Sequence, residues 1–256
     1  MQNLKIAMVQ ADQFWENKTA NLSHYDFLLK DIGEVDLIVL PEMFHTGFSM
    51  EAEALAEKMD GPAIAWLKEL ANSRDCAVYT SLIVHEGGAY FNRGVFVEPN
   101  GTIHSYNKRK TFGLAGEDKV YSSGTAEVIV PFRGINFQLQ ICYDLRFPEI
   151  VRNRLDTNGF PAYDVILYVA NWPQRRSVHW KSLLMARAIE NQCYVVGVNR
   201  VGEDGKGLLY SGDSRCIDAL GDIIECESGR EIVQVVTISK SALEEVRKTL
   251  PFLRDR

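Results

Sequence analysis

Three segments of this sequence end in side chains that could together perform covalent catalysis. Glu42 follows the apolar run Asp36–Leu40. Lys108 follows Thr102–Tyr106, and Cys142 ends an alternating apolar segment within QLQICYDLRFPE. Each segment is predicted to be a strand, and functional residues of open α/β sheets gather beyond the carboxyl ends of strands. Because an ammonium lowers the pKa of a nearby thiol and a carboxylate accepts its proton, the set predicts a cysteine nucleophile with a glutamate base.

Each of these residues also has a purely structural interpretation. Free cysteine is among the most buried residue types, a lone glutamate is more often a solvated loop acid, and a lone lysine is more often part of an exposed turn. The usual partner of a catalytic cysteine is histidine, but none of the five histidines stands in an obvious position. The prediction therefore depends on the combination of three groups at three strand ends.

The remaining cysteines are predicted to have no chemical role. Cys76 and Cys193 stand at the starts of two matching strands and are expected to be structural. Cys216 and Cys226 have no acid or lysine motif beside them and are expected to be core or surface thiols. The odd total of five, without any C-x-x-C, favours neither a disulfide framework nor a zinc site. No metal is expected.

The composition indicates a soluble, cytoplasmic protein with a substantial core. Of the 256 residues 46% are hydrophobic, yet no run approaches the ~18 apolar residues of a membrane span. The first residues, MQNLKIAMVQAD, lack the layout of a signal peptide. The net charge of −6 and the short basic cluster Lys108-Arg109-Lys110 argue against nucleic acid as a partner.

Strands and helices alternate along the first half of the chain. The predicted strands are Leu4–Gln10, Asp36–Leu40, Cys76–Val84, Ala89–Val97 and Thr102–Tyr106. The predicted helices are Asn17–Ile32 and Pro62–Asn72, the second with proline at a favoured first-turn position. The uninterrupted apolar run Asp36–Leu40 is typical of a strand that is covered on both faces.

The second half repeats this order. Three segments can be aligned with earlier ones: Asp164–Ala170 with Asp36–Leu40, Cys193–Asn199 (after the helix Ser182–Asn191) with Cys76–Val84, and Tyr210–Ile224 with Tyr90–Ile103. The offsets of 128, 117 and 120 residues are steady, which predicts two similar halves. We expect an α/β fold in which two sheets pack face to face with helices outside, a four-layer α-β-β-α sandwich. Residues 1–256 are predicted to form a single domain.

Four motifs stand in order along the chain: LPEMF (Leu40–Phe44), YNKRKTF (Tyr106–Phe112), AGED (Ala115–Asp118) and ICYDLRFPE (Ile141–Glu149). Together, in this order and spacing, they resemble the nitrilase superfamily of carbon–nitrogen hydrolases. The resemblance spans nearly the whole chain, to the closing PFLRDR. Within the superfamily the chain looks like the omega-amidases of the bacterial YafV type, because of FHTGFSM, AGED and NWPQRRSVHW.

The resemblance implies a Glu-Lys-Cys triad, here Glu42, Lys108 and Cys142, and a second glutamate, Glu117. It also implies a thioester intermediate and no metal or organic cofactor. The family often has His-Leu-Phe after its lysine, whereas this chain has Lys110-Thr111-Phe112. Lys110 is therefore a rival ammonium, although Lys108 keeps the place directly after Tyr-Asn.

The resemblance to omega-amidases further implies a small-molecule substrate, the monoamide of a short 2-oxo dicarboxylic acid such as 2-oxoglutaramate or 2-oxosuccinamate. The candidates for contacting it are Tyr143, through its backbone N–H, and the side chains of Phe48, Trp172, Arg175 and Arg176. Both arginines could equally form an exposed basic loop, and both aromatic residues could simply pack. Arg146 is expected to form a structural ion pair.

Two other functions are open from the sequence. One is a hydrolase of the same fold that cleaves a nitrile, an N-carbamoyl group or an aliphatic amide, because fold alone does not decide specificity. The other is a non-catalytic binding protein, which the intact set of Glu42, Lys108, Glu117 and Cys142 argues against. Since members of the superfamily commonly pair, we expect a homodimer.

Overall fold

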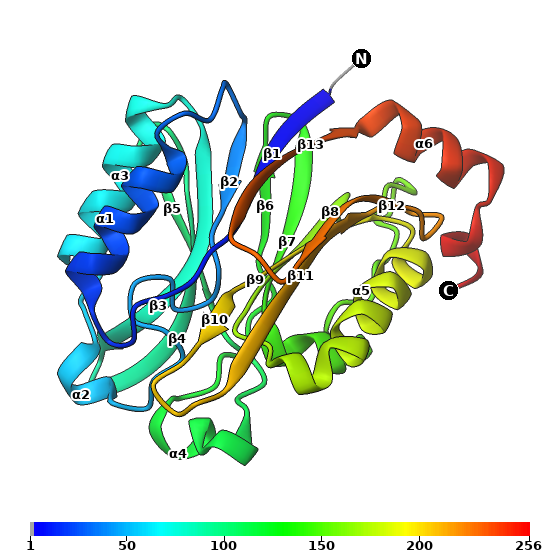
Figure 1. Cartoon of the computed structure of the whole chain (residues 1–256). Coiled ribbons are helices and arrows are strands. Elements are labelled where there is room, and N and C mark those ends of the chain that lie inside the picture. Colours follow the sequence, from blue (N-terminus) through cyan, green and yellow to red (C-terminus); the bar gives the residue numbers. More distant parts are fainter. Residues whose placement is uncertain (1–2) are drawn as a thin grey trace.

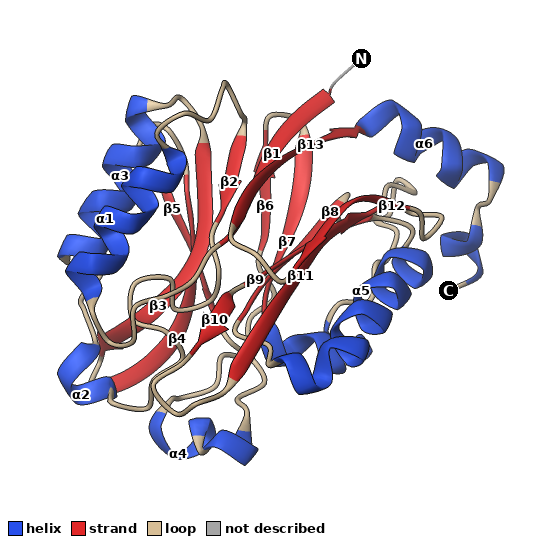
Figure 2. Ribbon diagram, in the orientation of Figure 1, coloured by secondary structure: helices blue, strands red, loops and turns tan. Residues whose placement is uncertain are grey.

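The computed structural model describes residues 3–256, apart from the side chains of residues 226 and 227. Two β-sheets lie at the centre of the molecule, with helices on their outer sides (Figures 1 and 2). This arrangement confirms the predicted α-β-β-α sandwich. The prediction for the Cys226 thiol lies outside the described side chains. No helix among the described residues is long and apolar enough to cross a membrane.

The first sheet has six strands in the order β13-β1-β2-β3-β4-β5. Their bounds are β1 Asn3–Gln10, β2 Leu37–Val39, β3 Ala77–Glu86, β4 Ala89–Val97, β5 Ile103–Asn107 and β13 Ile232–Ser239. β1, β2 and β3 run parallel, and β4 and β5 follow as an antiparallel meander. The carboxyl ends of β2 and β5 therefore point in the same direction.

The second sheet has seven strands, ordered β10-β11-β9-β8-β7-β6, with β12 also paired to β11. Their bounds are β6 Ile129–Phe132, β7 Ile135–Ile141, β8 Val165–Ala170, β9 Tyr194–Asn199, β10 Val201–Glu203, β11 Leu209–Ile217 and β12 Ile223–Ser228. β7, β8 and β9 run parallel, and β11 and β12 continue antiparallel. The same pairing order occurs in the first sheet, which confirms the two similar halves.

The helices cover the outer faces of the two sheets. Among the longer helices, α1 and α3 lie over the first sheet and α5 over the second (Figure 1). The helices are α1 Lys18–Leu29, α2 Ala52–Leu55, α3 Pro62–Ser73, α4 Glu117–Val120, α5 Ser177–Asn191 and α6 Lys240–Thr249. Short 3₁₀ turns are η1 Gly113–Ala115, η2 Cys142–Arg146, η3 Pro148–Ile150, η4 Gln174–Arg176 and η5 Phe252–Asp255.

Strand β2 shows why its sequence is apolar without alternation. Leu37 and Val39 join the core that lies between the two sheets, whereas Ile38 joins the core beneath α1 and α3. All three side chains are fully buried. A strand covered on both faces has no polar side, so the prediction from Asp36–Leu40 is confirmed.

The C-terminal half contributes one strand to the sheet of the N-terminal half. β13, near the end of the chain, pairs antiparallel with β1 along its whole length, from Asn3↔Ser239 to Gln10↔Ile232. The C-terminal half therefore completes the N-terminal sheet (Figure 1). Because the contact is between distant parts of the sequence, local patterns could not predict it.

Three helix boundaries differ from the prediction. α1 ends at Leu29 rather than Ile32, because Arg74 caps the Leu29 carbonyl with a hydrogen bond of 2.5 Å. α5 begins at Ser177, before the predicted Ser182, and the buried Trp180 anchors this extra turn. The sequence Phe147-Pro148-Glu149, with its early proline, also predicts the start of a helix, but the structure has only the one-turn η3 there. Beyond it, the Asn153 side chain binds the carbonyl of Asn191 at 3.0 Å and holds the chain extended.

Candidate active site

Cys142 is the first residue after β7, where the chain turns sharply into η2. Its φ angle is +44°, in the left-handed region that non-glycine residues rarely adopt. Such local strain persists only where the surroundings enforce it, and it is common at functional sites. The side chain is 9% exposed, so the thiol meets the wall of a cavity rather than open solvent.

Asp144 holds this turn in place. One carboxylate oxygen accepts hydrogen bonds from the Ile141 N–H at 3.0 Å and from the Tyr106 hydroxyl at 2.8 Å. The other accepts from the Lys110 N–H at 2.9 Å. Burial raises the pKa of Asp144 to about 6, although Lys108 and these donors oppose the rise. The carboxylate links the end of β5 in the first sheet to the turn after β7 in the second.

Lys108 lies at the centre of a buried charged cluster. Its Nζ is 2.9 Å from Glu42 Oε1 and 2.9 Å from each carboxylate oxygen of Glu117. The Lys108 side chain is 1% exposed and the two glutamates are 0% exposed. Glu42 follows β2 and Lys108 follows β5, so the structure brings together two residues predicted from separate strand ends. Glu117, which the family resemblance implied, opens α4 beside them.

The cluster determines the charge of the lysine and of the thiol. Burial alone lowers the pKa of Lys108, but Glu117 and Glu42 outweigh it and raise that pKa above its ordinary value. Burial and the Glu42 carboxylate raise the pKa of the Cys142 thiol well above its ordinary value, although Lys108 opposes the rise. The free protein therefore holds a charged ammonium beside a neutral thiol, and the thiol needs a base when it attacks.

Two asparagines that the sequence analysis missed complete the cluster. Asn92, on β4, donates from Nδ2 to Glu42 Oε1 at 2.8 Å and to Glu117 Oε1 at 3.1 Å. Asn171, directly after β8, donates its backbone N–H to Glu42 Oε2 at 2.8 Å and its Nδ2 to the Glu42 carbonyl at 2.6 Å. The strand-end rule could have found Asn171, whereas Asn92 lies inside a strand and carries no such signal.

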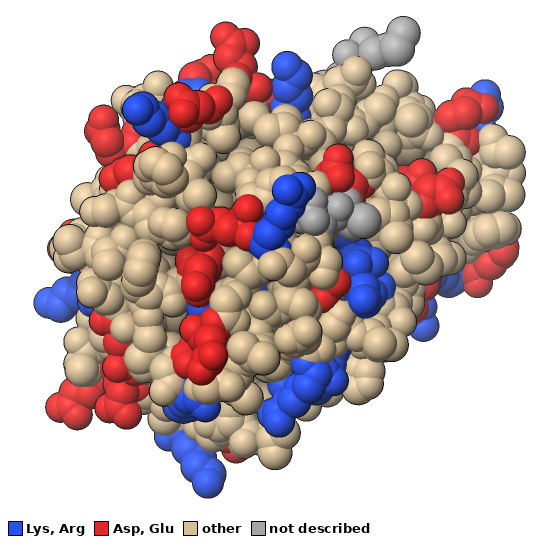
Figure 3. Space-filling model, in the orientation of Figure 1, with Lys and Arg blue, Asp and Glu red and all other residues tan. Residues whose placement is uncertain are grey.

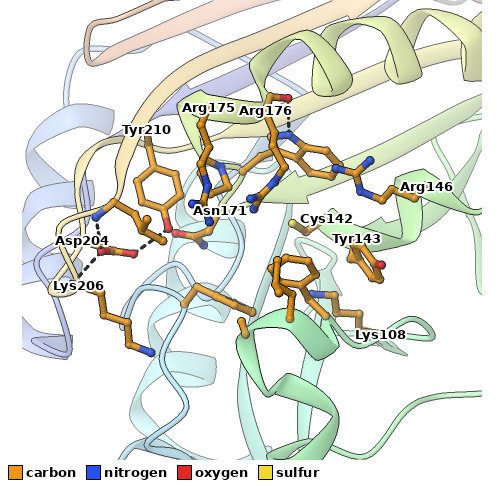
Figure 4. Close-up of a pocket in the computed structure, with 17 residues that line it drawn as sticks. Lys108, Cys142, Tyr143, Arg146, Asn171, Arg175, Arg176, Asp204, Lys206 and Tyr210 are labelled. Carbon is orange, nitrogen blue, oxygen red and sulfur yellow. Dashed lines mark hydrogen bonds between the residues drawn. The ribbon is translucent and has the colours of Figure 1, made fainter.

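A cavity of about 210 Å³ opens beside Cys142 (Figure 4). It is lined by Lys108, Cys142 and all five residues predicted to contact substrate, namely Phe48, Tyr143, Trp172, Arg175 and Arg176. Further lining residues are Phe112, Leu114, Ala115, Arg146, Asn171, Pro173, Asp204, Lys206, Leu208 and Tyr210. Glu42 and Glu117 do not line the cavity and contact Lys108 from behind its wall.

The aromatic residues of the wall hold charged neighbours in place. The Phe48 ring lies 5.2 Å from Lys108 Nζ. The Trp172 indole N–H donates to the Arg176 carbonyl at 2.8 Å, and the Tyr143 ring packs 4.9 Å from the Phe112 ring. Phe48, Trp172 and Tyr143 therefore line the cavity, and they also pack against other residues.

Three arginines surround the cavity. In Figure 4 the side chains of Arg175 and Arg176 extend from η4 toward the space beside Cys142, and Arg146 lies on the other side of that space. Among the described side chains, no carboxylate pairs with any of the three guanidinium groups. Burial, followed by the nearby Arg175, lowers the pKa of Arg176. A bound anion would relieve both effects.

The prediction that Arg146 forms a structural ion pair was wrong. Its guanidinium lies 4.6 Å from the Trp172 ring, and its Nη2 is 3.2 Å from Nδ1 of His179. Stacking on an aromatic ring stabilises a cation without neutralising it. The presence of arginine in the motif CYDLR gave no sign that its head would reach the cavity.

Lys110, the rival ammonium, lies elsewhere. Its Nζ is 4.7 Å from the Phe147 ring and 3.8 Å from Glu149 Oε1. It therefore takes no part in the cluster around Lys108. The other described cysteines, Cys76, Cys193 and Cys216, are 0% exposed and lie in the hydrophobic cores, as expected for structural thiols.

Comparison with known proteins decides the family. The profile of the carbon–nitrogen hydrolase family matches residues 5–248. The chain belongs to the carbon–nitrogen hydrolase family. This hydrolase is 43% identical to the omega-amidase YafV of Escherichia coli (strain K12) over 256 residues. The match covers 100% of this chain and 97% of the Escherichia coli protein. It is 33% identical to the 2-oxoglutaramate amidase of Bacillus subtilis (strain 168), with 98% and 96% covered.

A solved structure of this family shares the whole fold. It is a CN-hydrolase superfamily protein from Xanthomonas campestris with an arsenic adduct in its active site, 41% identical with a TM-score of 0.98, covering 100% of this chain and 98% of that one. The predicted membership of the nitrilase superfamily is confirmed. In the described part of this carbon–nitrogen hydrolase, no group of three or more His, Cys, Asp or Glu side chains could hold a metal ion.

Proposed function

We propose that this carbon–nitrogen hydrolase is an omega-amidase that releases ammonia from the terminal amide of 2-oxoglutaramate or 2-oxosuccinamate. The observation that carries the proposal is one small cavity with Cys142 and Lys108 on one wall and three guanidinium groups around it, none of which pairs with a carboxylate among the described side chains. Its volume of about 210 Å³ lies below the ~300–1,000 Å³ of sites for drug-sized ligands. It suits a short amide that carries a carboxylate.

The relatives support the same substrate class. The Escherichia coli protein is named an omega-amidase, and the Bacillus subtilis protein a 2-oxoglutaramate amidase. Both match the chain over nearly its full length. We assign the carboxylate of the substrate to Arg176, with Arg175 and Arg146 beside it, because Arg176 is half-buried in the cavity wall whereas Arg175 is exposed.

Acylation begins with the neutral Cys142 thiol. Glu42 takes the thiol proton as the sulfur attacks the amide carbon, and the carbon–oxygen double bond becomes an oxyanion. Lys108 and the backbone N–H of Tyr143 stabilise that oxyanion, and losing one such donor typically costs ~3 kcal/mol. Glu42 then gives its proton to the leaving nitrogen, ammonia departs and a thioester remains on Cys142.

Deacylation reverses the roles. Glu42 takes a proton from a water molecule that attacks the thioester carbon. It then gives that proton to the Cys142 sulfur as the carbon–sulfur bond breaks and the dicarboxylic acid is released. Glu117 forms no bond to substrate in this scheme. Since both of its oxygens are 2.9 Å from Lys108 Nζ, it fixes the ammonium at the oxyanion position. Each step uses side chains and one backbone N–H of this chain, together with water and substrate.

The test is ammonia release from a panel of purified compounds: 2-oxoglutaramate, 2-oxosuccinamate, a neutral amide of similar length, a nitrile and an N-carbamoyl compound. We expect the highest kcat/KM for the two 2-oxo acids and no turnover by Cys142→Ala. Faster turnover of the neutral amide, the nitrile or the carbamoyl compound would replace the proposed substrate class. Ammonia release by Cys142→Ala above a few per cent of the parent rate would contradict the nucleophile.

The single domain, the homodimer and the cytoplasmic location stay predictions. Light scattering of the purified protein would measure its oligomeric state, and a single cooperative unfolding transition would support one domain.

A further inference from the structure

Besides Lys108, the side chain of Asn92 contacts both buried glutamates. Its Nδ2 donates one hydrogen to Glu42 at 2.8 Å and the other to Glu117 at 3.1 Å. Because both partners are acceptors, the amide is oriented with nitrogen toward them. Its Oδ1 is left buried without a partner among the described residues, an unfavourable state that proteins usually avoid unless it serves a purpose.

The hydrogen bonds around Glu42 distinguish its two oxygens. Oε1 accepts from Lys108 Nζ and Asn92 Nδ2, whereas Oε2 accepts from the Asn171 N–H. A carboxylate oxygen has two lone-pair positions in the plane of the group. Oε1 is therefore fully engaged, and Oε2 keeps one position free to take a proton.

We propose that Asn92 is a positioning residue that keeps Glu42 and Glu117 ionised together and leaves Glu42 Oε2 as the oxygen that accepts the Cys142 proton. The proposal rests on the role of Glu42 as base given above. Two carboxylates that share one ammonium tend to retain a proton between them, and a donor shared by both opposes this. Asn92 does not line the cavity, so it acts through Glu42 rather than on substrate.

The other groups that face the carboxylate pair are few. Lys108 approaches from the end of β5 and Cys142 from the end of β7, and both can titrate. The Asn171 N–H, from the end of β8, and the Phe112 N–H, which donates to Glu117 Oε2 at 2.5 Å, are neutral. Tyr121, directly after α4, is a further titratable group close to both carboxylates. A change at Asn92 alters none of these partners directly, which makes its effect on the pair measurable.

The experiment follows the pH dependence of two rates in Asn92→Ala and Asn92→Asp. One is kcat/KM for ammonia release, and the other is alkylation of Cys142 by iodoacetamide, with Cys142→Ala as the blank. We expect kcat to fall at least tenfold, KM to stay within about threefold, and the acid limb of both profiles to move up by about one pH unit, because losing a donor favours the protonated carboxyl pair. Asn92→Asp should move the acid limb at least as far, since the new carboxylate adds a third negative charge beside Glu42 and Glu117.

Asn153 provides a matched control. It is 1% exposed, donates twice from Nδ2, to the carbonyls of Tyr163 and Asn191, and has a buried Oδ1 without a partner among the described residues. Asn153→Ala should lower the melting temperature while leaving both acid limbs unchanged. A purely structural Asn92 would behave in the same way, and an unshifted limb in Asn92→Ala would overturn the proposal.

The alkylation rate separates this proposal from the proposed substrate. If the parent releases no ammonia from 2-oxoglutaramate, the substrate assignment fails, but alkylation still reports on Asn92. If the pH profile of alkylation is the same in Glu42→Gln as in the parent protein, Glu42 is not the base. The inference about Asn92 then fails as well.

Discussion

Lys108 illustrates how a charge is kept inside this protein. A buried ammonium is costly unless it is paired and its hydrogens are bonded. Here two carboxylates, Glu42 and Glu117, meet it at 2.9 Å. The pairing keeps the lysine charged, so it can act on an oxyanion that forms beside it.

Replacing the two lysines separately tests this assignment. We expect Lys108→Met to lower kcat by about 10²–10³-fold through loss of the oxyanion donor. The variant should also lose stability by about 3–5 kcal/mol, because two buried carboxylates are left without their cation. Lys110→Met is the control and should keep its activity, since Lys110 contacts Phe147 and Glu149 instead. Steady-state kinetics and urea unfolding measure both effects, and a dead Lys110→Met with an active Lys108→Met would refute the assignment.

The arginines of the cavity test the substrate carboxylate. Arg176→Ala should lower kcat/KM for 2-oxoglutaramate. The loss should correspond to about 2–5 kcal/mol of binding free energy, the usual value when one partner of a partly buried ion pair is truncated. The loss should appear mainly in KM if the contact is equally strong in the ground and transition states. Arg176→Lys should restore it only in part, because an ammonium lacks the planar two-pronged contact. Arg175→Ala should lose less, and an equal loss for a neutral amide would show that the arginines only shape the loop.

How much of this site the sequence could predict differs from residue to residue. Lys108 and Cys142 follow a strand directly and Glu42 comes three residues after the end of β2, so their positions follow from chain direction and sheet order. Asn92 and Arg146 depend on how side chains from different segments meet, and no local pattern encodes that. Arg146 reaches the cavity because Trp172, from another strand end, provides the ring on which it stacks.

At the scale of elements, the two sheets are tied together beside the nucleophile. Tyr106 on β5 reaches across to Asp144, which follows β7. The hydroxyl is one of three donors that fix the turn of Cys142. The position of the thiol therefore depends on the packing of one sheet against the other.

Tyr106→Phe tests this link. We expect a loss of about 1 kcal/mol in the free energy of unfolding, typical of one buried hydrogen bond, together with a several-fold fall in kcat. Tyr79→Phe is the matched control, because Tyr79 is equally buried and its hydroxyl donates at 2.9 Å to the Gln140 carbonyl rather than to Asp144. It should lose similar stability but keep kcat. If both variants lose the same fraction of kcat, the link to the turn has no specific role.

Glu57 connects two helices to the loop that carries Glu42. It accepts from the Ala63 N–H at the start of α3 at 2.8 Å, from Lys18 at the start of α1 at 3.0 Å, and from the buried His45 at 3.2 Å. Burial by itself raises the pKa of Glu57, but the bonds from His45 and Ala63 outweigh it and lower that pKa to about 2. The ionised form is therefore the stabilising one.

Glu57→Gln tests the pH dependence that follows. A folded-state pKa below the ordinary 4.5 contributes stability that is present above that value and is lost as the pH falls toward 2. We expect the variant to be about 2 kcal/mol less stable than the parent at pH 7. The difference should shrink steadily between pH 4.5 and about 2. Urea midpoints at several pH values measure it, and a difference independent of pH would contradict the role of the charge.

The boundaries of the elements show where local patterns stop being sufficient. β2 was predictable because a strand that is buried on both faces has apolar residues at successive positions, and its sequence shows such a run. The early start of α5 was not, because Trp180 is anchored by the nearby Trp172 ring and by the Asp213 carbonyl, which lies 33 residues further along the chain. The pairing of β13 with β1 likewise depends on a contact between the two ends of the chain.

For the whole molecule, the net charge is negative but the charge of the cavity is positive. The net charge is −6, and on the face shown in Figure 3 acidic and basic side chains are interspersed. The cavity, in contrast, is lined by Arg146, Arg175, Arg176, Lys206 and Lys108, and among its lining residues the one acid is Asp204. The composition predicted the net charge but not this local excess, because the cations come from four separate segments.

This contrast predicts how salt changes the reaction. An anionic substrate is repelled by the molecule at long range and attracted by the cavity, where low-dielectric walls strengthen the local field. Salt screens exposed charges beyond about 10 Å at 0.1 M, so raising it from about 0.02 M to about 0.5 M should lower kcat/KM for 2-oxoglutaramate several-fold. A neutral amide of similar length should be almost unaffected, and Arg175→Ala should flatten the dependence for the anionic substrate because it removes an exposed cation at the rim. Equal salt dependence for both amides would mean that the arginines act on the stability of the loop and not on the charge of the substrate.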